Sequence, residues 1–159
     1  MSGAGDSGRI IALDIGKVRI GVAASDPTGT FASPVTVLKA SGNWMDDLAG
    51  IIEKYDAVKL LVGLPCRTDG SEGPEAKTVR HVISRLSDRF PDMEILAWDE
   101  RFTTVIAASA LLEADVSRAG RKGRVDKVAA SVLLQSYLDS GRPVRIMNNN
   151  LIRERGAPA

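Results

Sequence analysis

Apolar and polar positions follow two different periods along this chain, and together they predict strands that give way to alternating helices and strands. Residues 9–16, RIIALDIG, are apolar on both faces of a strand, because successive side chains point to opposite sides. Such a strand is typical of a sheet covered by helices on both faces. One residue breaks this pattern, since Asp14 shares a face with Ile10 and Ala12. An unpaired buried carboxylate costs on the order of several kcal/mol, so Asp14 requires a partner.

The remaining chain supplies four more strands and four helices. Strands show alternating or continuous apolar runs, and helices show apolar residues at helical spacing. The predicted strands are residues 9–16, 18–25, 33–40, 59–65 and 93–100. The predicted helices are residues 43–56, 74–90, a third beginning at Thr103 or Thr104 and ending near residue 112, and 126–138.

This β-β-β-α-β-α-β-α order predicts an α/β fold with a mixed five-stranded sheet and helices on both faces. Residues 1–8 are interpreted as a flexible tail, residues 9–141 as one domain, and residues 142–159 as a C-terminal tail. We expect the first and fifth strands to be neighbours in the middle of the sheet, because both are apolar on both faces.

Acidic residues are predicted to gather at one edge of this sheet. Asp14 ends the first strand, and Asp99 and Glu100 end the fifth. Ligands of open α/β sheets bind at this carboxyl edge. Asp99 and Glu100 lie on opposite faces by alternation, and we favour Glu100 because of its longer reach.

The last predicted helix adds another acid, Asp126. It continues the stripe of Ala130, Leu133 and Tyr137 by one turn, so it lies on the core-facing side. Converging carboxylates without a cation raise at least one pKa, whereas with divalent ions they form a site of oxygen ligands suited to Mg²⁺ or Mn²⁺. The candidate metal ligands are therefore Asp14, Asp99, Glu100 and Asp126. Two such ions can support phosphodiester cleavage.

Composition excludes several other kinds of site. The formal net charge is +1, so attraction to a polyanion must come from local clustering. Cys66 is the single cysteine and His81 the single histidine, which excludes an intramolecular disulfide and makes a Ser-His-Asp triad improbable. No apolar run reaches the roughly 18 residues of a membrane span, and residues 1–8 lack the apolar core of a signal peptide. We therefore expect a cytoplasmic protein with no membrane partner.

Basic residues cluster beside the proposed acids. Residues 117–124, SRAGRKGR, are interpreted as a mobile basic loop that contacts nucleic-acid phosphates, or alternatively as an ordinary solvated surface. Residues 68–76, TDGSEGPEA, form either a phosphate-binding loop or an ordinary glycine turn. The candidate nucleic-acid-binding residues are Arg19, Arg67, Ser71, Arg101, Thr103, Thr104, Arg121, Lys122, Arg124 and Lys127.

Four segments taken together resemble the YqgF family, also called RuvX, over roughly residues 9–139. These segments are ALDIGKVRIGVAASD, LLVGLPCRTDGSEGPEA, DERFTT and DKVAASVLLQSYLD. The resemblance implies an RNase H-like fold and a nuclease that matures the 5′ end of pre-16S rRNA; some members are described as Holliday junction resolvases. It also implies that the catalytic acids are Asp14, one acid of the Asp99–Glu100 pair, and Asp126. A fourth carboxylate that is common in relatives is replaced here by residues 63–66, GLPC.

Alternative interpretations remain open at this stage. Asp14 can cap the turn at Gly16, and Asp126 can be the N-cap of its helix. For the whole chain, the leading hypothesis is a metal-dependent endonuclease that acts on structured nucleic acid, most of all pre-rRNA, as a monomer or a homodimer. The alternative substrate is a four-way DNA junction, which requires the dimer. A nucleic-acid-binding factor in transcription that does not cleave is the second hypothesis. An actin-like ATPase is disfavoured because it needs a second large domain. Cys66 can be buried as a small apolar residue or form a disulfide between two copies.

Overall fold

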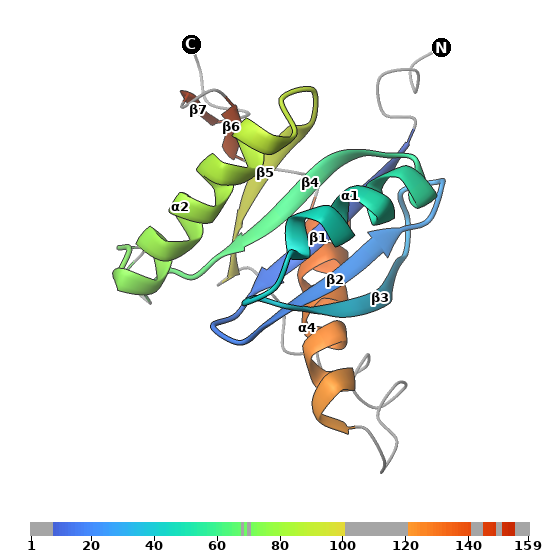
Figure 1. Ribbon diagram of the computed structural model, residues 1–159. Helices are drawn as coiled ribbons and strands as arrows, with labels where there is room; N and C mark the ends of the chain where they lie inside the picture. The colour runs from blue at the N-terminus through green and yellow to red at the C-terminus, as the bar shows by residue number, and fades with distance from the viewer. Residues whose placement is uncertain are drawn as a thin grey trace.

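The computed structural model describes residues 8–67, 69, 71–100, 121–140, 145–148 and 151–154 (Figure 1). For residues 121–127 and for the last two ranges, the structure describes the backbone alone. The expected helix after Thr103 or Thr104 lies outside the described residues, as do Arg101, Thr103 and Thr104 themselves. No helix in the described ranges is long and apolar enough to span a membrane.

The five predicted strands form the centre of a mixed sheet, which confirms the predicted fold class. They are β1 (Arg9–Ile15), β2 (Arg19–Ser25), β3 (Ala32–Lys39), β4 (Ala57–Leu64) and β5 (Glu94–Asp99). Strands β1, β4 and β5 are parallel, β2 pairs antiparallel with β1, and β3 pairs antiparallel with β2. Two short strands, β6 (Arg145–Asn148) and β7 (Leu151–Glu154), extend the sheet within the segment interpreted as a C-terminal tail.

The strand order is β3-β2-β1-β4-β5-β6-β7, so the expectation that β1 and β5 are neighbours is wrong. β4 lies between them and is parallel to both. The physical reason is that β4 is as apolar on both faces as its neighbours, with Leu60, Leu61 and Val62 all fully buried. Apolarity on both faces therefore identifies the three central strands without giving their order.

Helices cover both faces of the sheet, as predicted (Figure 1). Helices α1 (Trp44–Tyr55) and α2 (Pro74–Arg89) pack on the face that carries Ile11 and Leu13. Helix α4 (Arg121–Asp139) packs on the other face, against Ile10 and Ala12. Helix α4 crosses β1, β2 and β3 on this face, and its Tyr137 ring meets the Trp98 ring of β5 edge to face, with centroids 5.5 Å apart.

Helix α4 begins earlier than expected. Residues 121–124 belong to its first turn, so the expectation of a loop through Arg124 is wrong for these four residues. Gly123 lowers helix stability by about 1 kcal/mol relative to Ala. It does not end the helix, because the residues on either side, Lys122 and Arg124, favour helical structure. Asp126 consequently lies inside the helix, and the interpretation of it as an N-cap is wrong.

A tight turn joins β1 to β2 directly after Asp14. The Gly16 N–H donates to the Arg19 carbonyl oxygen at 2.9 Å. A Cβ at position 16 would lie 2.6 Å from that oxygen, so only glycine fits this turn. The turn therefore holds the acidic end of β1 and the basic start of β2 close together.

The turn between β2 and β3, at the other end of these strands, is tied to α4 by one side chain. The Gln135 Nε2 donates to the Thr30 carbonyl oxygen at 3.0 Å, and the Ala32 N–H donates to Gln135 Oε1 at 3.0 Å. These bonds fix the position of α4 along β2 and β3.

Candidate active site

Asp14 lies on the α4 face of β1, next to the buried Ala12, and its side chain is half-buried. Its cross-strand neighbour on β2 is Gly21, which has no side chain to fill the space beside the carboxylate. On the other side, Leu13 pairs with Val62, so the adjacent position of β4 is Gly63. Asp14 is thus flanked by glycines in both neighbouring strands.

Glu100 follows β5 on the same face as Asp14. Leu96 and Trp98 pack against α4, and alternation places Glu100 on their side of the sheet. A Cβ at Gly63 would lie 2.8 Å from Glu100 Oε1 and 3.0 Å from Leu133 Cδ2. The Glu100 side chain therefore lies directly over the backbone of β4, in space that exists only because residue 63 is glycine.

This placement brings Glu100 to Asp14 across an intervening strand. Neighbouring strands lie about 4.8 Å apart, so β1 and β5 are separated by about twice that distance. The side chains of Glu100 and Asp14 nevertheless share a hydrogen bond. We refer to these two residues as the carboxylate pair.

The electrostatics of the carboxylate pair are those of an acid site without a cation. Burial, the charge of Asp14, the hydrogen bond with Asp14 and the charge of Asp99 together raise the pKa of Glu100 from 4.5 to about 7. A hydrogen bond between two carboxyl groups requires a proton on one of them. Below about pH 7, in the absence of a bound cation, the carboxylate pair therefore shares one proton.

Asp99 occupies a different position from Glu100. It ends β5 opposite Leu64, and alternation directs it to the face where Ala97 packs against the α1 and α2 side of the core. Its charge still contributes to the raised pKa of Glu100. The structure therefore places Glu100, and not Asp99, on the face of Asp14.

Asp126 lies on α4, whose orientation is fixed by the residues that follow it. Ala130, Leu133 and Tyr137 are buried against the sheet, with exposed fractions of 0, 3 and 2%. Tyr137 packs on Trp98, while Leu133 reaches the level of Gly63 and Glu100, so α4 runs toward the carboxyl edge as residue numbers decrease. Asp126 continues this stripe beyond Leu133 by about 10 Å of helix.

Among the residues whose side chains are described, no three acidic, histidine or cysteine side chains lie close enough together to hold a metal ion. The carboxylate pair provides two oxygen donors of the type that Mg²⁺ and Mn²⁺ prefer. Burial and the neighbouring negative charges disfavour the ionised form of Glu100, and a bound cation would remove this cost. The side chain of Asp126, the expected third donor, lies outside the described part of the chain.

The predicted nucleic-acid-binding residues fall into separate groups. Arg19 begins β2, directly after the turn that follows Asp14. Arg67 lies over the start of α2, since a Cβ at Gly73 would be 3.2 Å from its Nε. The backbones of Arg121, Lys122, Arg124 and Lys127 belong to the first half of α4.

The loop around Ser71 is closed by its own hydrogen bonds. The backbone N–H and hydroxyl of Ser71 both donate to Asp69 Oδ1, at 2.9 and 2.7 Å. Glu72 forms a two-pronged ion pair with Arg80 of α2. These contacts favour the ordinary turn over the phosphate-binding loop, because the Ser71 donors that would hold a phosphate are already used.

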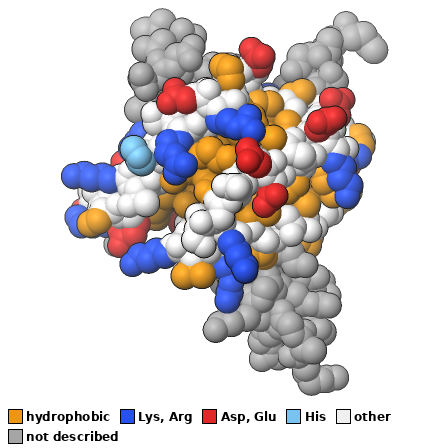
Figure 2. All heavy atoms as spheres, in the orientation of Figure 1, with side chains coloured by type: hydrophobic (Ala, Val, Ile, Leu, Met, Phe, Trp, Pro, Cys, Tyr) orange, Lys and Arg blue, Asp and Glu red, His pale blue; other side chains and the backbone are white. Residues whose placement is uncertain are grey.

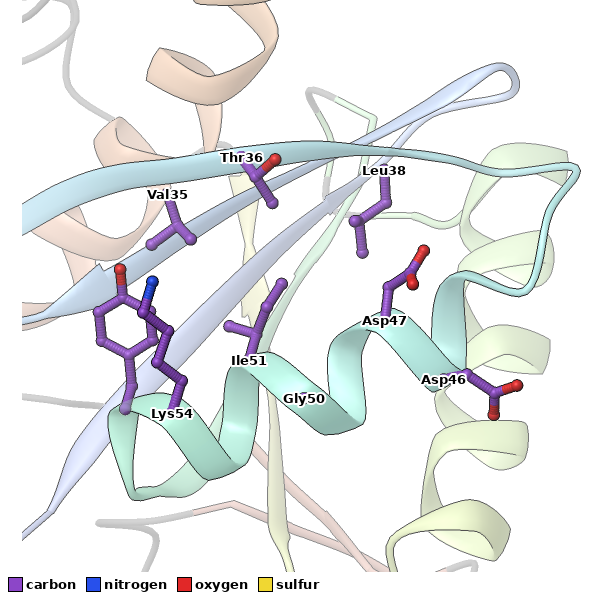
Figure 3. Close-up of a pocket in the computed structure, with 9 residues that line it drawn as sticks. Val35, Thr36, Leu38, Asp46, Asp47, Gly50, Ile51 and Lys54 are labelled. Atoms are coloured by element: carbon purple, nitrogen blue, oxygen red, sulfur yellow. The ribbon is translucent and has the colours of Figure 1, made fainter.

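A separate groove lies on the opposite face of the sheet, between β3 and α1 (Figure 3). It encloses about 510 Å³ and is lined by Leu38 and Ile51 together with Asp46, Asp47 and Lys54. On this face acidic and basic side chains are interspersed (Figure 2). The sheet separates the groove from the carboxylate pair, and its two acids do not suit a phosphate backbone.

Comparisons with known proteins agree with this architecture. The family described as "RuvX: Holliday junction resolvase" matches residues 8–140. A protein of Halothermothrix orenii is 45% identical over 82% of this chain and 94% of its own length, and one of Thermoanaerobacter pseudethanolicus is 44% identical over 83% and 96%. Both are named "Putative pre-16S rRNA nuclease".

Solved structures show the same fold at low sequence identity. RuvC of T. thermophilus in complex with a Holliday junction substrate has a TM-score of 0.53 at 11% identity, covering 84% of this chain and 96% of that one. The fowlpox virus resolvase in complex with Holliday junction DNA has a TM-score of 0.53 at 15% identity, covering 83% and 97%. The family match and the curated relatives show that the chain belongs to the RuvX family of nucleases, as the resemblance predicts. Nucleases of this family are hydrolases of phosphodiester bonds.

Proposed function

We propose that this protein is a metal-dependent endonuclease of the cytoplasm that processes the 5′ end of pre-16S rRNA. Asp14, Glu100 and Asp126 are its catalytic carboxylates, and Mg²⁺ or Mn²⁺ is its cofactor. The observation that carries this proposal is the carboxylate pair: two partly buried, hydrogen-bonded acids at the carboxyl edge of the sheet. The names of the curated relatives support the choice of substrate.

The residues of the site have separate roles in this mechanism. Asp14 and Glu100 supply oxygen ligands, Gly63 leaves the space in which Glu100 reaches Asp14, and Asp126 supplies a third carboxylate from α4. When bound, divalent ions activate the attacking water and stabilise the leaving oxygen. Asp99 adds negative charge from the opposite face without acting as a ligand.

Basic residues on two sides of the carboxylate pair hold the nucleic acid. Arg19 lies beside the end of β1, and Arg121, Lys122, Arg124 and Lys127 are carried by the half of α4 that extends past the sheet. Contacts of this kind are made to phosphates, so they position any strand and do not select a sequence.

The test is cleavage of end-labelled pre-16S rRNA with Mg²⁺ or Mn²⁺ by the wild type and by Asp14→Asn. We expect defined cleavage near the mature 5′ end by the wild type and none by Asp14→Asn. Binding of the RNA without cleavage under all metal conditions would contradict the proposal and favour a binding factor.

A four-way DNA junction belongs in the same assay, because the family is described as Holliday junction resolvases. Symmetric cleavage of a two-fold junction requires a two-fold enzyme. Junction cleavage by a homodimer, with intact pre-rRNA, would make this protein a resolvase.

A further inference from the structure

A small pocket lies just around the sheet edge from the carboxylate pair. It encloses about 280 Å³ between the β1–β2 turn, the end of β4 and the first turns of α2. Ile15, Pro65, Pro74 and Val79 form apolar walls, and Lys17 and Glu75 are exposed polar residues of the lining. The pocket belongs to the α1 and α2 face, where Ile15 packs against the core, whereas the carboxylate pair belongs to the α4 face.

The pocket and the carboxylate pair are joined through consecutive residues of β1. Asp14 and Ile15 have Cα atoms about 3.8 Å apart, and their side chains point to opposite faces. A nucleic-acid strand that crosses the carboxyl edge with one phosphate at Asp14 therefore brings the next nucleotide over Ile15.

The chemistry of the pocket suits a base better than a phosphate. Its volume is below the usual range for pockets that bind drug-sized ligands, and its apolar walls can cover the faces of one flat ring. The Glu75 carboxylate repels a phosphate but accepts hydrogen bonds from an amino group, as acidic side chains do from cytosine. Lys17 adjoins the turn after Asp14, where it can contact the phosphate that follows the base.

We propose that this pocket binds the unpaired base of the nucleotide next to the scissile phosphate, with preference for a base that carries an exocyclic amino group. The inference rests on the proposed function and specifies its substrate as a strand with an unpaired nucleotide at the cleavage position. Recognition of splayed-out bases is the usual way in which proteins read RNA sequence. The pocket thereby gives sequence preference to a site whose basic residues read only the backbone.

The experiment measures binding, with Ca²⁺ in place of the catalytic metal so that turnover is blocked. The probes are a fluorescein-labelled RNA hairpin with a single-stranded 5′ extension and the same RNA with one abasic nucleotide at each extension position in turn. Thr78→Trp fills the pocket from an exposed position of α2, and Ser84→Trp is the matched control at an exposed position outside the pocket lining.

We expect one abasic position to weaken wild-type binding about tenfold. Thr78→Trp should bind the intact RNA about tenfold more weakly and show no further loss with the abasic RNA, while Ser84→Trp should match the wild type. Glu75→Gln should remove a preference of several-fold for cytosine over uracil at that position. The pocket proposal is overturned if the wild type is indifferent to every abasic position, or if Thr78→Trp behaves as Ser84→Trp does.

Failure of the pocket proposal and failure of the proposed function would give different results. Cleavage of pre-rRNA by the wild type together with indifference to abasic positions would leave the nuclease and remove the base pocket. The abasic effect without any cleavage would keep the pocket as a nucleic-acid-binding element and remove the nuclease assignment. Melting curves of Thr78→Trp and Glu75→Gln verify that both variants are folded.

Discussion

Two acids at opposite ends of the sheet show how differently one fold can treat a carboxylate. Asp26, in the β2–β3 turn, accepts hydrogen bonds from the Thr28 hydroxyl and from the Phe31 and Thr30 N–H groups, at 2.9 and 2.8 Å for the latter two. The Thr28 bond and these backbone bonds lower its pKa to about 2. Glu100 is surrounded instead by apolar side chains and other acids, and its pKa is raised to about 7.

This difference separates an acid with a structural role from a candidate functional acid. Asp26 has the donors that it needs within its own turn, so its charge is already compensated. Glu100 has a neighbour of the same charge, so compensation must come from a proton or from a bound cation. Acids whose pKa is raised by burial and like charge mark candidate functional sites.

The sharpest test of this contrast is to neutralise each acid in turn. Asp14→Asn and Glu100→Gln should lower kcat by roughly 10³-fold or more, because a lost metal ligand removes several kcal/mol of transition-state stabilisation. Asp26→Asn should leave kcat within about twofold of the wild type, since that acid lies at the far end of the sheet. Single-turnover cleavage of labelled RNA provides the measurement. Full activity in Asp14→Asn would end the assignment of the carboxylate pair.

The next effect comes from the glycine that makes room for Glu100. Gly63→Ala should lower kcat by roughly 10- to 100-fold, the range observed when groups that orient metal ligands are changed, because its Cβ would lie 2.8 Å from Glu100 Oε1. Stability should fall by about 1 to 3 kcal/mol as Leu133 is displaced.

Gly50→Ala is the matched control for Gly63→Ala. A Cβ at position 50 of α1 meets no atom within 4 Å, so this change should raise stability by up to about 1 kcal/mol and leave activity unaltered. Equal activity in the two variants would contradict the role of Gly63.

A third test uses the pH dependence of stability in the metal-free protein. The folded-state pKa of Glu100 lies above its ordinary value of 4.5, so the native state becomes less stable as pH rises from about 4.5 to about 7. The shift sets a ceiling of about 3 kcal/mol, which solvent screening of the partly exposed carboxyl reduces. Urea unfolding at pH 5 and pH 8 should show this loss in the wild type and not in Glu100→Gln.

Asp26 should act in the opposite direction and in a lower pH range. Its folded pKa is depressed, so its contribution is present above its ordinary pKa of 3.8 and disappears as pH falls toward 2. Asp26→Asn should therefore flatten the acid limb of the stability curve and leave the limb above pH 4.5 unaltered. The contrast between the two acids would be contradicted if Asp26→Asn and Glu100→Gln changed stability in the same pH range.

The smallest expected effect is stabilisation by metal. At pH 8, Mg²⁺ or Mn²⁺ at ten times its dissociation constant should stabilise the wild type by about 1.4 kcal/mol, because only the native state assembles the site. Asp14→Asn should show no increase in melting temperature, whereas Asp26→Asn should show the full increase. An unchanged wild-type melting temperature at millimolar metal would mean that the carboxylate pair binds no cation.

Local patterns in the sequence predict the parts of this architecture that depend on a single element. The period of two places Asp14 on the face of Ile10 and Ala12, and helical spacing predicts the buried stripe of Ala130 and Leu133; the structure agrees on all four apolar positions. The face of the sheet or helix on which a residue lies can therefore be predicted from the sequence, because it depends only on the strand or helix that contains the residue.

Relations between elements were less accessible. The sequence does not predict the central position of β4, because β1, β4 and β5 are all apolar on both faces. The approach of Glu100 to Asp14 over Gly63 depends on three strands at once, and no spacing within one segment encodes it. The hydrogen bonds that Asp26 accepts depend on a loop conformation without a periodic pattern, so no spacing in the sequence predicts them.

The position of β4 also has a consequence for how the enzyme matures. Asp14 belongs to the first strand and Glu100 follows the fifth, and they meet only after β4 has inserted between β1 and β5 in parallel register. Parallel pairings between segments far apart in sequence close late, because each must overcome the entropy of a long loop. A nascent chain therefore displays its acids as isolated, solvated charges, and the carboxylate pair of the proposed active site forms only once the central sheet is complete.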